Sequence, residues 1–219
     1  MKEALIFGST GLIGNHLYNL LLKDNYYTNI KLYVRKDTNV SHPKVEIINI
    51  DFNNLENYSD LITGDDCYFC IGTTKKETPI KDAYRKIEYD IPIAIAKIAK
   101  KNNINSFIYV SSLGSSPTTK NTYLRNKGQV EEALKILNFH KLSIIQPSLL
   151  LGSRNTFRLG EFILQRVFKS LSFLFRGSLK KYAAIDAENV ARAMINISKN
   201  NLNDVYFDSN YLQNLSKKI

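Results

Sequence analysis

Tyr123 and Lys127 are the pair of side chains in this sequence best suited to move a proton. They stand four residues apart at the start of a predicted helix over residues 122–137, so the phenol and the ammonium share one helical face, one turn apart. A neighbouring cation stabilises a phenolate and lowers the tyrosine pKa, so Tyr123 could exchange a proton with a carbonyl or an alcohol near neutral pH. Thirteen tyrosines among many lysines also produce such pairs by chance. The rest of the chain has to support the pair.

A glycine-rich loop follows the first apolar run of the chain, residues 4–7, which predicts a strand buried on both faces of a sheet. The glycines are spaced G-x-x-G-x-x-G, and an amphipathic helical pattern comes next. Strand, loop and helix in this order are typical of a unit that holds a pyrophosphate at the helix N-terminus. A structural turn that needs glycine at positive φ is the alternative. The residues predicted to bind the nucleotide are Gly8, Ser9, Thr10, Gly11, Leu12, Ile13 and Gly14.

The second apolar run, residues 30–34, is followed by Arg35 and Lys36. An NAD-specific site carries an acidic residue there, about 20 residues beyond the glycine loop, where it binds the ribose 2′-hydroxyl. Here Asp37 comes late, and two cations suit a 2′-phosphate. The sequence therefore predicts NADP(H) in preference to NAD(H). A solvated turn with chance charges is the alternative.

Segments that look like strands and helices alternate along the chain, with no repeat and no low-complexity linker. The succession predicts an α/β fold of the Rossmann type, a doubly wound parallel sheet with strand order 3-2-1-4-5-6. Predicted strands cover residues 4–7, 30–34, 45–50, 67–71, 106–110 and 142–146, with a short one at 205–207. Beyond the helix after the glycine loop, predicted helical segments cover residues 54–62, 79–101 with a bend near Pro92, 122–137 and 186–198.

Ligands of such sheets bind at the carboxyl ends of the strands, and the unusual residues of this chain gather there. Beyond the residues already named, they are Asp51, Phe52, Ile71, Gly72, Thr73, Thr74, Ser111, Ser112, Pro147 and Ser148. We expect Asp51, Phe52 and residues 71–73 to contact the cofactor.

The composition fits one globular domain over residues 1–219, with 44% hydrophobic residues. No apolar run at the N-terminus reaches the length of a signal peptide or a membrane span, and with two cysteines we expect a cytoplasmic protein. The formal net charge of +10 favours anionic ligands. A bias toward Asn, Lys and Ile weakens this argument, so nucleic acid is not expected as a partner.

Cys67 and Cys70 form a Cys-x-x-Cys pattern that invites a redox or metal interpretation. The context predicts a strand, on which residues three apart face opposite sides. A redox pair would sit at a helix start, and zinc would need two more ligands. His16, His42 and His140 lack ligand spacing, so we expect inert thiols and no metal site.

The stretch from residue 154 to residue 181 is basic and aromatic, with seven cations and one acid, a net charge of 7 − 1 = +6. Such a stretch can lie on a membrane surface or on a protein partner. We favour a lid helix that closes a substrate pocket, so residues 154–219 are expected to form a small C-terminal elaboration of the domain.

Several longer motifs carry a resemblance to a known family. They are residues 70–74 (CIGTT), 111–114 (SSLG), 123–131 (YLRNKGQVE), 146–154 (QPSLLLGSR) and 185–193 (IDAENVARA). With the glycine loop they span nearly the whole chain. The chain resembles the atypical short-chain dehydrogenases/reductases, and more narrowly the Tat-interacting-protein oxidoreductase group.

The resemblance implies NADP(H) bound across the carboxyl edge and a hydride moved to or from the nicotinamide. It implies that Ser112, or Ser111 beside it, hydrogen-bonds the substrate oxygen and that Tyr123 is the general acid/base. Lys127 would orient the cofactor ribose and depress the tyrosine pKa.

The same resemblance places Gly72 near the adenosine half of the cofactor and Arg154 near the entrance for cofactor or substrate. Gln146 departs from the family pattern, because many relatives carry arginine before the proline. Leu113 follows the serine pair, so which serine acts is open.

The function predicted from these observations is an NADP(H)-dependent oxidoreductase acting on a small carbonyl or alcohol. A nucleotide-sugar epimerase is a rival, although little sequence is left for a sugar-binding domain. A cofactor-bound regulator or assembly factor without turnover is a second rival, and the basic stretch favours it. Substrate and oligomeric state are not identified.

Overall fold

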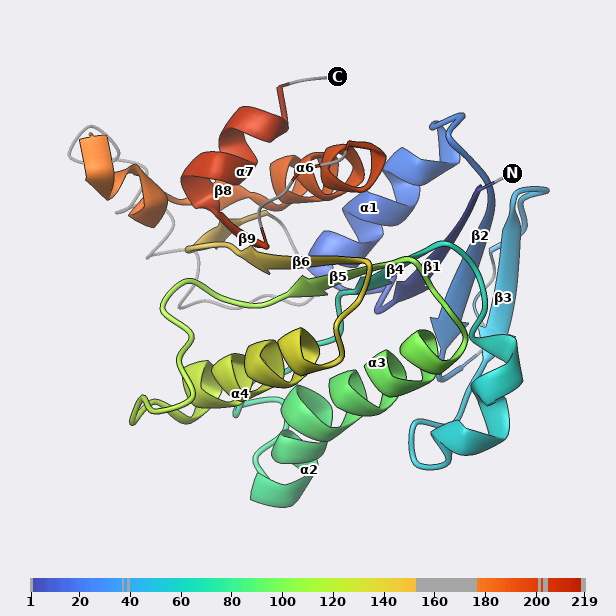
Figure 1. Cartoon of the computed structure of the whole chain (residues 1–219), viewed down its shortest axis with the longest axis horizontal. Coiled ribbons are helices and arrows are strands. Elements are labelled where there is room, and N and C mark those ends of the chain that lie inside the picture. The colour runs from blue at the N-terminus through green and yellow to red at the C-terminus, as the bar shows by residue number, and fades with distance from the viewer. Residues whose placement is uncertain are drawn as a thin grey trace.

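The computed structural model describes residues 2–36, 38, 40–152, 177–200, 202 and 205–217. Its centre is a parallel sheet in the order β3-β2-β1-β4-β5-β6-β9, shown in Figure 1. The strands are β1 (Lys2–Phe7), β2 (Tyr27–Val34), β3 (Val45–Asn49), β4 (Asp66–Phe69), β5 (Ser106–Val110), β6 (Lys141–Gln146) and β9 (Tyr206–Asp208). Two short strands, β7 (Leu150–Leu151) and β8 (Ile185–Asp186), pair in a second sheet.

The predicted fold class and strand order are confirmed, and β9 extends the sheet beyond β6. Ala4 to Phe7 of β1 are each 0% exposed, as expected of a strand covered on both faces. Strand β4 ends at Phe69, two residues earlier than predicted, so Cys70 and Ile71 belong to the loop at the carboxyl edge.

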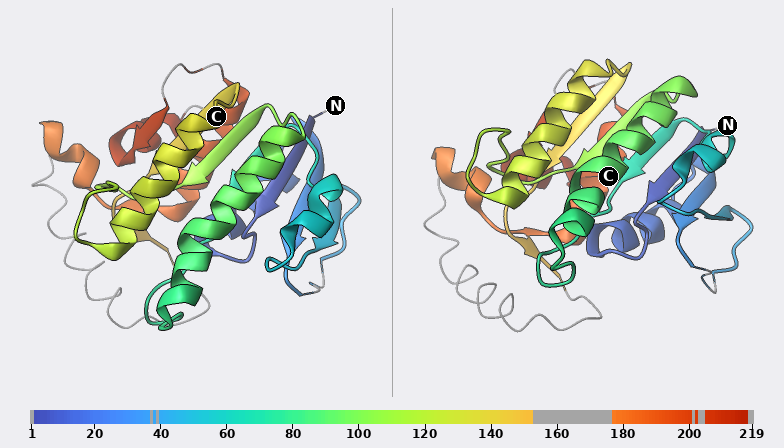
Figure 2. Two further views of the ribbon diagram at one scale, coloured as in Figure 1. Left: turned by 60° about the horizontal axis from the view of Figure 1, so that its bottom comes forward. Right: turned by 90° about the horizontal axis from the view of Figure 1, so that it is seen from below.

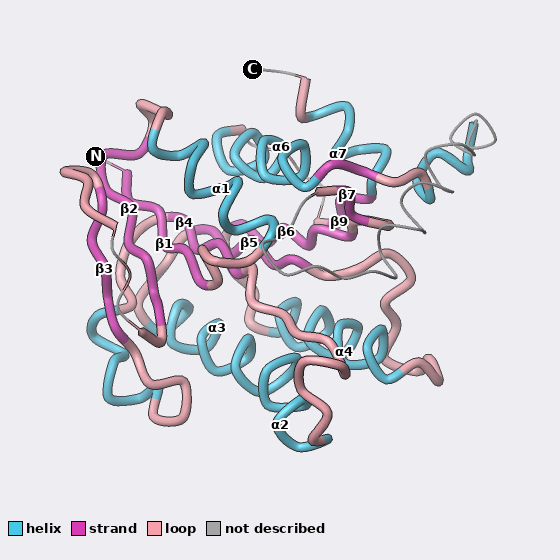
Figure 3. Tube along the Cα trace, turned by 180° about the vertical axis from the view of Figure 1, so that it is seen from behind, coloured by secondary structure: helices cyan, strands magenta, loops and turns pink. Residues whose placement is uncertain are grey.

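Helices cover both faces of the sheet (Figures 1 and 3). On one face lie α1 (Leu12–Leu22), α6 (Ala187–Lys199) and α7 (Ser209–Leu215), which share an apolar cluster. On the other face α3 (Ile91–Lys101) and α4 (Thr122–Ile136) pack side by side, as Figure 2 shows, above a second cluster. The short segments are η1 (Leu55–Leu61), α2 (Lys81–Arg85), η2 (Lys86–Asp90) and η4 (Gly177–Tyr182).

The helical region before β5 is predicted to bend near Pro92, and the structure has a π-helical turn directly before α3, in which this proline lies. Between α2 and α3 the chain makes a π-helical turn, η2, in which the Ile91 N–H bonds the Lys86 carbonyl five residues back. Pro92 has no N–H to donate to the carbonyl four residues earlier, that of Glu88, and its ring would crowd that carbonyl. A wider turn removes the conflict and turns Glu88 toward the carboxyl edge, where it lines a cavity described below.

Gly128 lies inside α4, where a glycine costs helix stability. A Cβ atom at this position would lie 2.4 Å from the backbone carbon of Ser116. The loop between β5 and α4 therefore rests directly on the helix, and the glycine permits this approach.

The predicted lid depends on residues 154–176, which lie outside the described residues. Of the remaining C-terminal elaboration, α6 packs on α1 and β9 joins the central sheet. Within the described part of the chain, no helix has the length and apolar character needed to cross a membrane.

Candidate functional site

A cavity of about 710 Å³ lies at the carboxyl edge of the sheet. It is lined by the start of α1, the loops after β4, β5 and β6, and the first turns of α4. Nine of the predicted site residues line it together, namely Gly11, Leu12, Ile13, Ile71, Gly72, Thr73, Ser112, Tyr123 and Lys127. Segments more than 100 residues apart in the sequence therefore meet at one place.

The glycine loop is shaped by close backbone approaches. Gly8 has a φ of +91°, and a Cβ atom there would lie 2.9 Å from the backbone of Cys70 and Ile71. A Cβ atom at Gly14 would lie 2.1 Å from the Gly8 carbonyl oxygen, so helix and loop touch at this point. Gly8 and Gly14 thus allow close backbone packing on the side of the loop away from the cavity, while Gly11 lines the cavity.

Helix α1 begins without a side-chain cap. Its N-cap residue is Gly11, and its first turn contains no acidic residue. The first N–H groups of a helix lack partners inside the helix and carry the positive end of its dipole. An uncapped helix start that opens into a cavity suits a pyrophosphate.

Arg35 and Lys36 follow the carboxyl end of β2 and are exposed. Asp51 follows β3, and its carboxylate accepts hydrogen bonds from the backbone N–H of Asn53 at 2.8 Å and from the side chains of Asn53 and Asn54. These bonds, the Asn53 N–H first, lower the pKa of Asp51. Phe52 packs against the apolar cluster beneath α3 and α4.

These four residues lie at the same sheet edge but outside the lining of the cavity, as do Ser9 and Thr10 of the loop. Arg154 lies outside the described residues.

The two serines after β5 have different surroundings. Ser111 is 3% exposed, and its hydroxyl donates to Oε1 of Glu131 in α4. Glu131 also accepts from Ser115 at 2.5 Å and from Gln146 at 3.0 Å. Ser112 is half-buried and lines the cavity.

Lys127 is buried at the floor of the cavity. Its ammonium lies 3.3 Å from Oε2 of Glu88, donates to the Val110 carbonyl at 3.1 Å and sits 4.9 Å from the Tyr109 ring centroid. Burial by itself lowers the pKa of Lys127, but the neighbouring Tyr109, Glu88 and Tyr123 outweigh it and leave the pKa raised.

Tyr123 lies in the first turn of α4, whose N-cap Asn121 accepts the Leu124 N–H at 3.2 Å. Its ring centroid lies 5.9 Å from the Lys127 ammonium, and its side chain lines the cavity. Tyrosine and lysine thus share one helical face, as their spacing predicts.

Several residues that line the cavity were not singled out from the sequence, among them the ionisable Lys75, Tyr84, Glu88 and Lys120. Tyr84 is 4% exposed, and burial, with Glu88 next in importance, raises its pKa to about 12. A signal for Glu88 existed in Pro92, four residues later, because a proline inside a helical pattern displaces the preceding turn. No sequence pattern singles out Lys75, Tyr84 or Lys120.

The cysteines lie on opposite faces of the sheet, as predicted. Cys67 belongs to the cluster beneath α3 and α4, whereas Cys70 packs against the cluster beneath α1 and α6. Burial raises the pKa of both thiols, that of Cys70 to about 12. Among the described residues, no three His, Cys, Asp or Glu side chains gather as metal ligands would.

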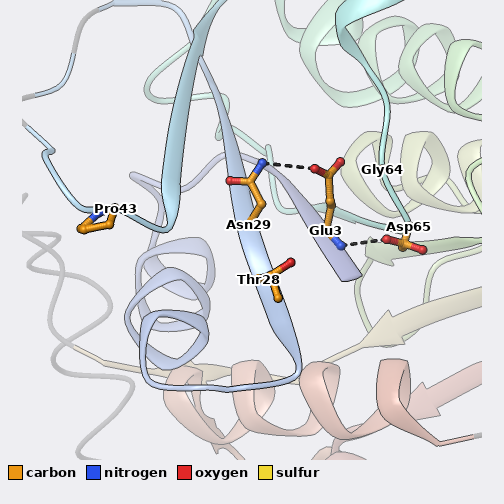
Figure 4. Close-up of a pocket in the computed structure, with 6 residues that line it drawn as sticks. All are labelled: Glu3, Thr28, Asn29, Pro43, Gly64 and Asp65. Atoms are coloured by element: carbon orange, nitrogen blue, oxygen red, sulfur yellow. Dashed lines mark hydrogen bonds between the residues drawn. The ribbon is translucent and has the colours of Figure 1, made fainter. Parts of the chain in front are cut away.

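A second hollow lies at the opposite, amino edge of the sheet (Figure 4). The Glu3 N–H donates to Asp65 at 2.7 Å there, and Asn29 donates to the Glu3 carboxylate at 3.3 Å. These contacts tie the starts of β1, β2 and β4 together, and none of the predicted site residues lines this hollow.

Comparison with known proteins identifies the family of this chain and relates its fold to that of solved structures. The sequence model of a family described as NAD(P)H-binding matches residues 8–201. Protein HTATIP2 of Rattus norvegicus is 29% identical over 199 residues, covering 89% of this chain and 80% of that protein. Protein FMP52, mitochondrial, of Coccidioides immitis is 28% identical over 208 residues, covering 89% of this chain and 85% of that protein.

Among solved structures, the Bordetella bronchiseptica enzyme WbmH in complex with NAD+ superposes with a TM-score of 0.69 at 17% identity. The superposition covers 95% of this chain and 75% of WbmH. The two molecules are similar in fold.

Proposed function

Because the chain belongs to the NAD(P)H-binding family, we propose that it is an NADP(H)-dependent oxidoreductase that reversibly reduces a carbonyl group on a small molecule. The observation that carries this proposal is the cavity at the carboxyl edge, in which the open start of α1 faces Ser112, Tyr123 and Lys127. A helix start suited to a dinucleotide and a tyrosine suited to acid/base chemistry thus line one cavity.

The residues present fit a dinucleotide. The uncapped N-terminus of α1 would hold the pyrophosphate. A Cβ atom at Gly72 would lie 3.4 Å from Glu88 and 3.9 Å from the Lys127 ammonium, so the missing side chain leaves room for a ligand against that floor. Arg35 and Lys36, exposed at the end of β2, would pair with a 2′-phosphate, which supports NADP(H) over NAD(H).

In this proposal the bound nicotinamide supplies or accepts the hydride. Ser112 hydrogen-bonds the substrate oxygen, because the Ser111 hydroxyl is engaged by Glu131. Tyr123 gives its proton to that oxygen during reduction and takes it back during oxidation. Lys127 donates hydrogen bonds to ribose hydroxyls and places a positive charge near the phenol.

The test of this function is Tyr123→Phe, which removes the acidic proton and keeps the ring. Oxidation of NADPH with a panel of small aldehydes and ketones should fall by at least about a hundredfold, because a positioned acid/base contributes roughly 10²–10⁴. The dissociation constant of NADPH, read from its fluorescence, should change less than about twofold. Tyr26→Phe, at an exposed tyrosine, is the matched control.

A regulator that uses NADPH only as a ligand predicts another result. Wild type and Tyr123→Phe would then bind NADPH equally, and neither would turn over any member of the panel. That outcome would reject the oxidoreductase and leave the cofactor site standing.

The location of the protein is part of the proposal. We place it in the cytoplasm, while the fungal relatives carry mitochondrial names. Fractionation of cells that express the full chain with a C-terminal tag decides between the two compartments, and recovery in the mitochondrial fraction would contradict the cytoplasmic assignment.

A further inference from the structure

Glu88 and Lys127 form a buried ion pair at the floor of the cavity. Oε2 of Glu88 lies 3.3 Å from the ammonium, and the two side chains are 0% and 4% exposed. Within the described part of the chain, Oε2 accepts no hydrogen bond. The ammonium of Lys127 is the group that compensates its charge. Because burial of charges is costly, such a pair is weak support for stability and a better candidate for a functional arrangement.

The backbone holds Glu88 in place from two sides. The π-helical turn before Pro92 directs it toward the carboxyl edge, and its Oε1 accepts the backbone N–H of Thr73 at 2.5 Å. Thr73 belongs to the loop after β4, whereas Lys127 belongs to α4. One carboxylate therefore links the loop, the π turn and the helix that lines the cavity.

Gly72 lies directly against this buried pair at the lining of the cavity. A Cβ atom at Gly72 would lie 3.4 Å from Oε1 of Glu88 and 3.9 Å from the ammonium, and a larger side chain would cover both. Gly72, Glu88 and Lys127 all line the cavity. A ligand seated on Gly72 would therefore lie close to the pair.

The charge on Lys127 depends on what faces it. The ionisable groups around the ammonium are Glu88 from the π turn, Tyr84 from α2, Cys70 from the loop after β4, Tyr109 from β5 and Tyr123 from α4 itself. Burial raises the pKa values of Tyr84, Cys70 and Tyr109, so these groups are neutral at neutral pH. Of the five groups, Glu88 is the one that forms an ion pair with the Lys127 ammonium, at 3.3 Å.

We propose that Glu88 is a positioning residue that fixes the Lys127 ammonium at the cavity floor and keeps it charged. Lys127 then acts as a permanent cationic donor to the cofactor and carries no proton in the reaction, which leaves proton exchange to Tyr123. The inference rests on the proposed function for the identity of the ligand. The ion pair between Glu88 and Lys127 can be tested without any ligand.

The experiment follows Lys127 directly in the protein without cofactor. Lysines labelled with ¹³C at Cε are titrated by NMR from pH 6 to pH 10.5, and the Lys127 signal is assigned by its loss in Lys127→Arg. In the wild type we expect no titration of this signal below pH 10. In Glu88→Gln we expect it to titrate inside the range, because burial then acts without a compensating charge.

The binding readout uses NADPH. From pH 6.5 to pH 9.5 the wild-type dissociation constant should change less than about twofold, whereas in Glu88→Gln it should rise at least about fivefold as Lys127 loses its proton. Glu88→Asp, which keeps the charge one methylene further back, should lie between them. Glu3→Gln, which breaks the Glu3–Lys31 pair at the amino edge, is the matched control and should behave as wild type.

A folded Glu88→Gln protein in which Lys127 still resists titration to pH 10 overturns the inference. If Glu88→Gln does not give a native circular dichroism spectrum, Glu88→Met, which is also uncharged and of similar length, is titrated in its place, and an unchanged titration of Lys127 rejects the role of Glu88. Failure of the wild type to bind NADPH would contradict the proposed function instead, whatever the lysine titration shows.

Discussion

The Ser111 hydroxyl donates a hydrogen bond to Oε1 of Glu131, a carboxylate of α4 that is 4% exposed. Ser115 and Gln146 donate to the same oxygen. This cluster fastens the chain after β5 to α4 and to the end of β6. It also distinguishes two neighbouring serines. Both line the cavity, but the Ser111 hydroxyl is engaged by Glu131, whereas Ser112 has no part in this cluster.

Replacement of each serine should therefore have a different effect. Ser112→Ala should lower kcat/KM by about 10–100-fold, equivalent to ~1.4–2.8 kcal/mol, and leave stability unchanged. Ser111→Ala removes a donor from buried Glu131 and should lower the free energy of unfolding by about 1–3 kcal/mol. Urea denaturation and NADPH turnover of both variants measure this. Equal turnover of Ser112→Ala and wild type would contradict the proposal that Ser112 hydrogen-bonds the substrate oxygen.

The cofactor preference should follow the charge after β2. We expect the wild type to bind NADPH at least about tenfold more tightly than NADH, a difference of ~1.4 kcal/mol. Arg35→Glu should reverse or abolish the preference, because a carboxylate repels the 2′-phosphate and accepts a bond from a 2′-hydroxyl. Titration of both cofactors checks it, with Lys97→Glu, at an exposed lysine of α3, as a control that also reverses a charge. Tighter binding of NADH by the wild type would contradict the prediction.

A methyl group at Gly14 should damage the glycine loop. Its Cβ atom would lie 2.1 Å from the Gly8 carbonyl oxygen, so α1 must shift. We expect a loss of about 1–3 kcal/mol, typical of overpacking, and a fall in Tm of ~2–4 °C per kcal/mol. Gly11→Ala is the comparison, because its Cβ would lie 3.3 Å from the same oxygen and face the cavity.

Gly11→Ala should therefore unfold at nearly the wild-type temperature. It should nevertheless bind NADPH more weakly than the wild type, because its methyl group would enter the cavity. A Gly14→Ala protein with the wild-type Tm would show that the loop tolerates the shift. Calorimetry and NADPH fluorescence separate the two effects.

Asp66 gives the chain a pH-dependent stability. Burial raises its pKa, while the hydroxyl of Tyr27, donating to it at 2.8 Å, acts in the opposite direction. The folded state therefore binds this proton more tightly than the unfolded state. Asp66 lowers stability as pH rises from its ordinary unfolded pKa of about 3.9 through its folded pKa. Below both values the effect is absent.

Asp66→Asn removes this loss and should raise Tm at pH 7, with the gain shrinking as pH falls toward 3.9. Thermal denaturation from pH 3.5 to pH 7.5 checks the trend. Asp60→Asn, at an exposed carboxylate, is the control. A gain for Asp66→Asn that is constant with pH would mean that the substitution acts through packing.

Much of the fold could be predicted because its signals are local. Apolar runs, the glycine loop and the helical pattern after it predict a parallel sheet with a nucleotide site at its carboxyl edge, and the observed strand order confirms the sheet. The motif-based resemblance is likewise confirmed by the match to HTATIP2. Tyr123 and Lys127 could be found because both lie in one helix, where spacing alone fixes their relation.

What could not be predicted depends on contacts between distant segments. Glu88 meets Lys127 only when the π turn, the loop after β4 and α4 pack together. Gln146 stands where many relatives carry arginine. Its hydrogen bond to Glu131 could not be predicted, because the two residues come together only when β6 packs beside α4. Gly128 of α4 is similarly explained by a contact between segments, because the backbone of Ser116 in the preceding loop leaves no room for a Cβ atom there.

The packing of α1 against α6 has a consequence for the order in which the molecule can be built. A ribosome releases the glycine loop and α1 first, yet the part of the apolar surface of α1 that packs on α6 is covered only after residues 187–199 have emerged. β9, which closes the sheet edge beside β6, emerges later still. Nascent chains that stop before residue 187 should leave α1 unsupported and bind NADPH poorly. The glycine loop and α1 are thus synthesised long before the helix that completes the packing around them.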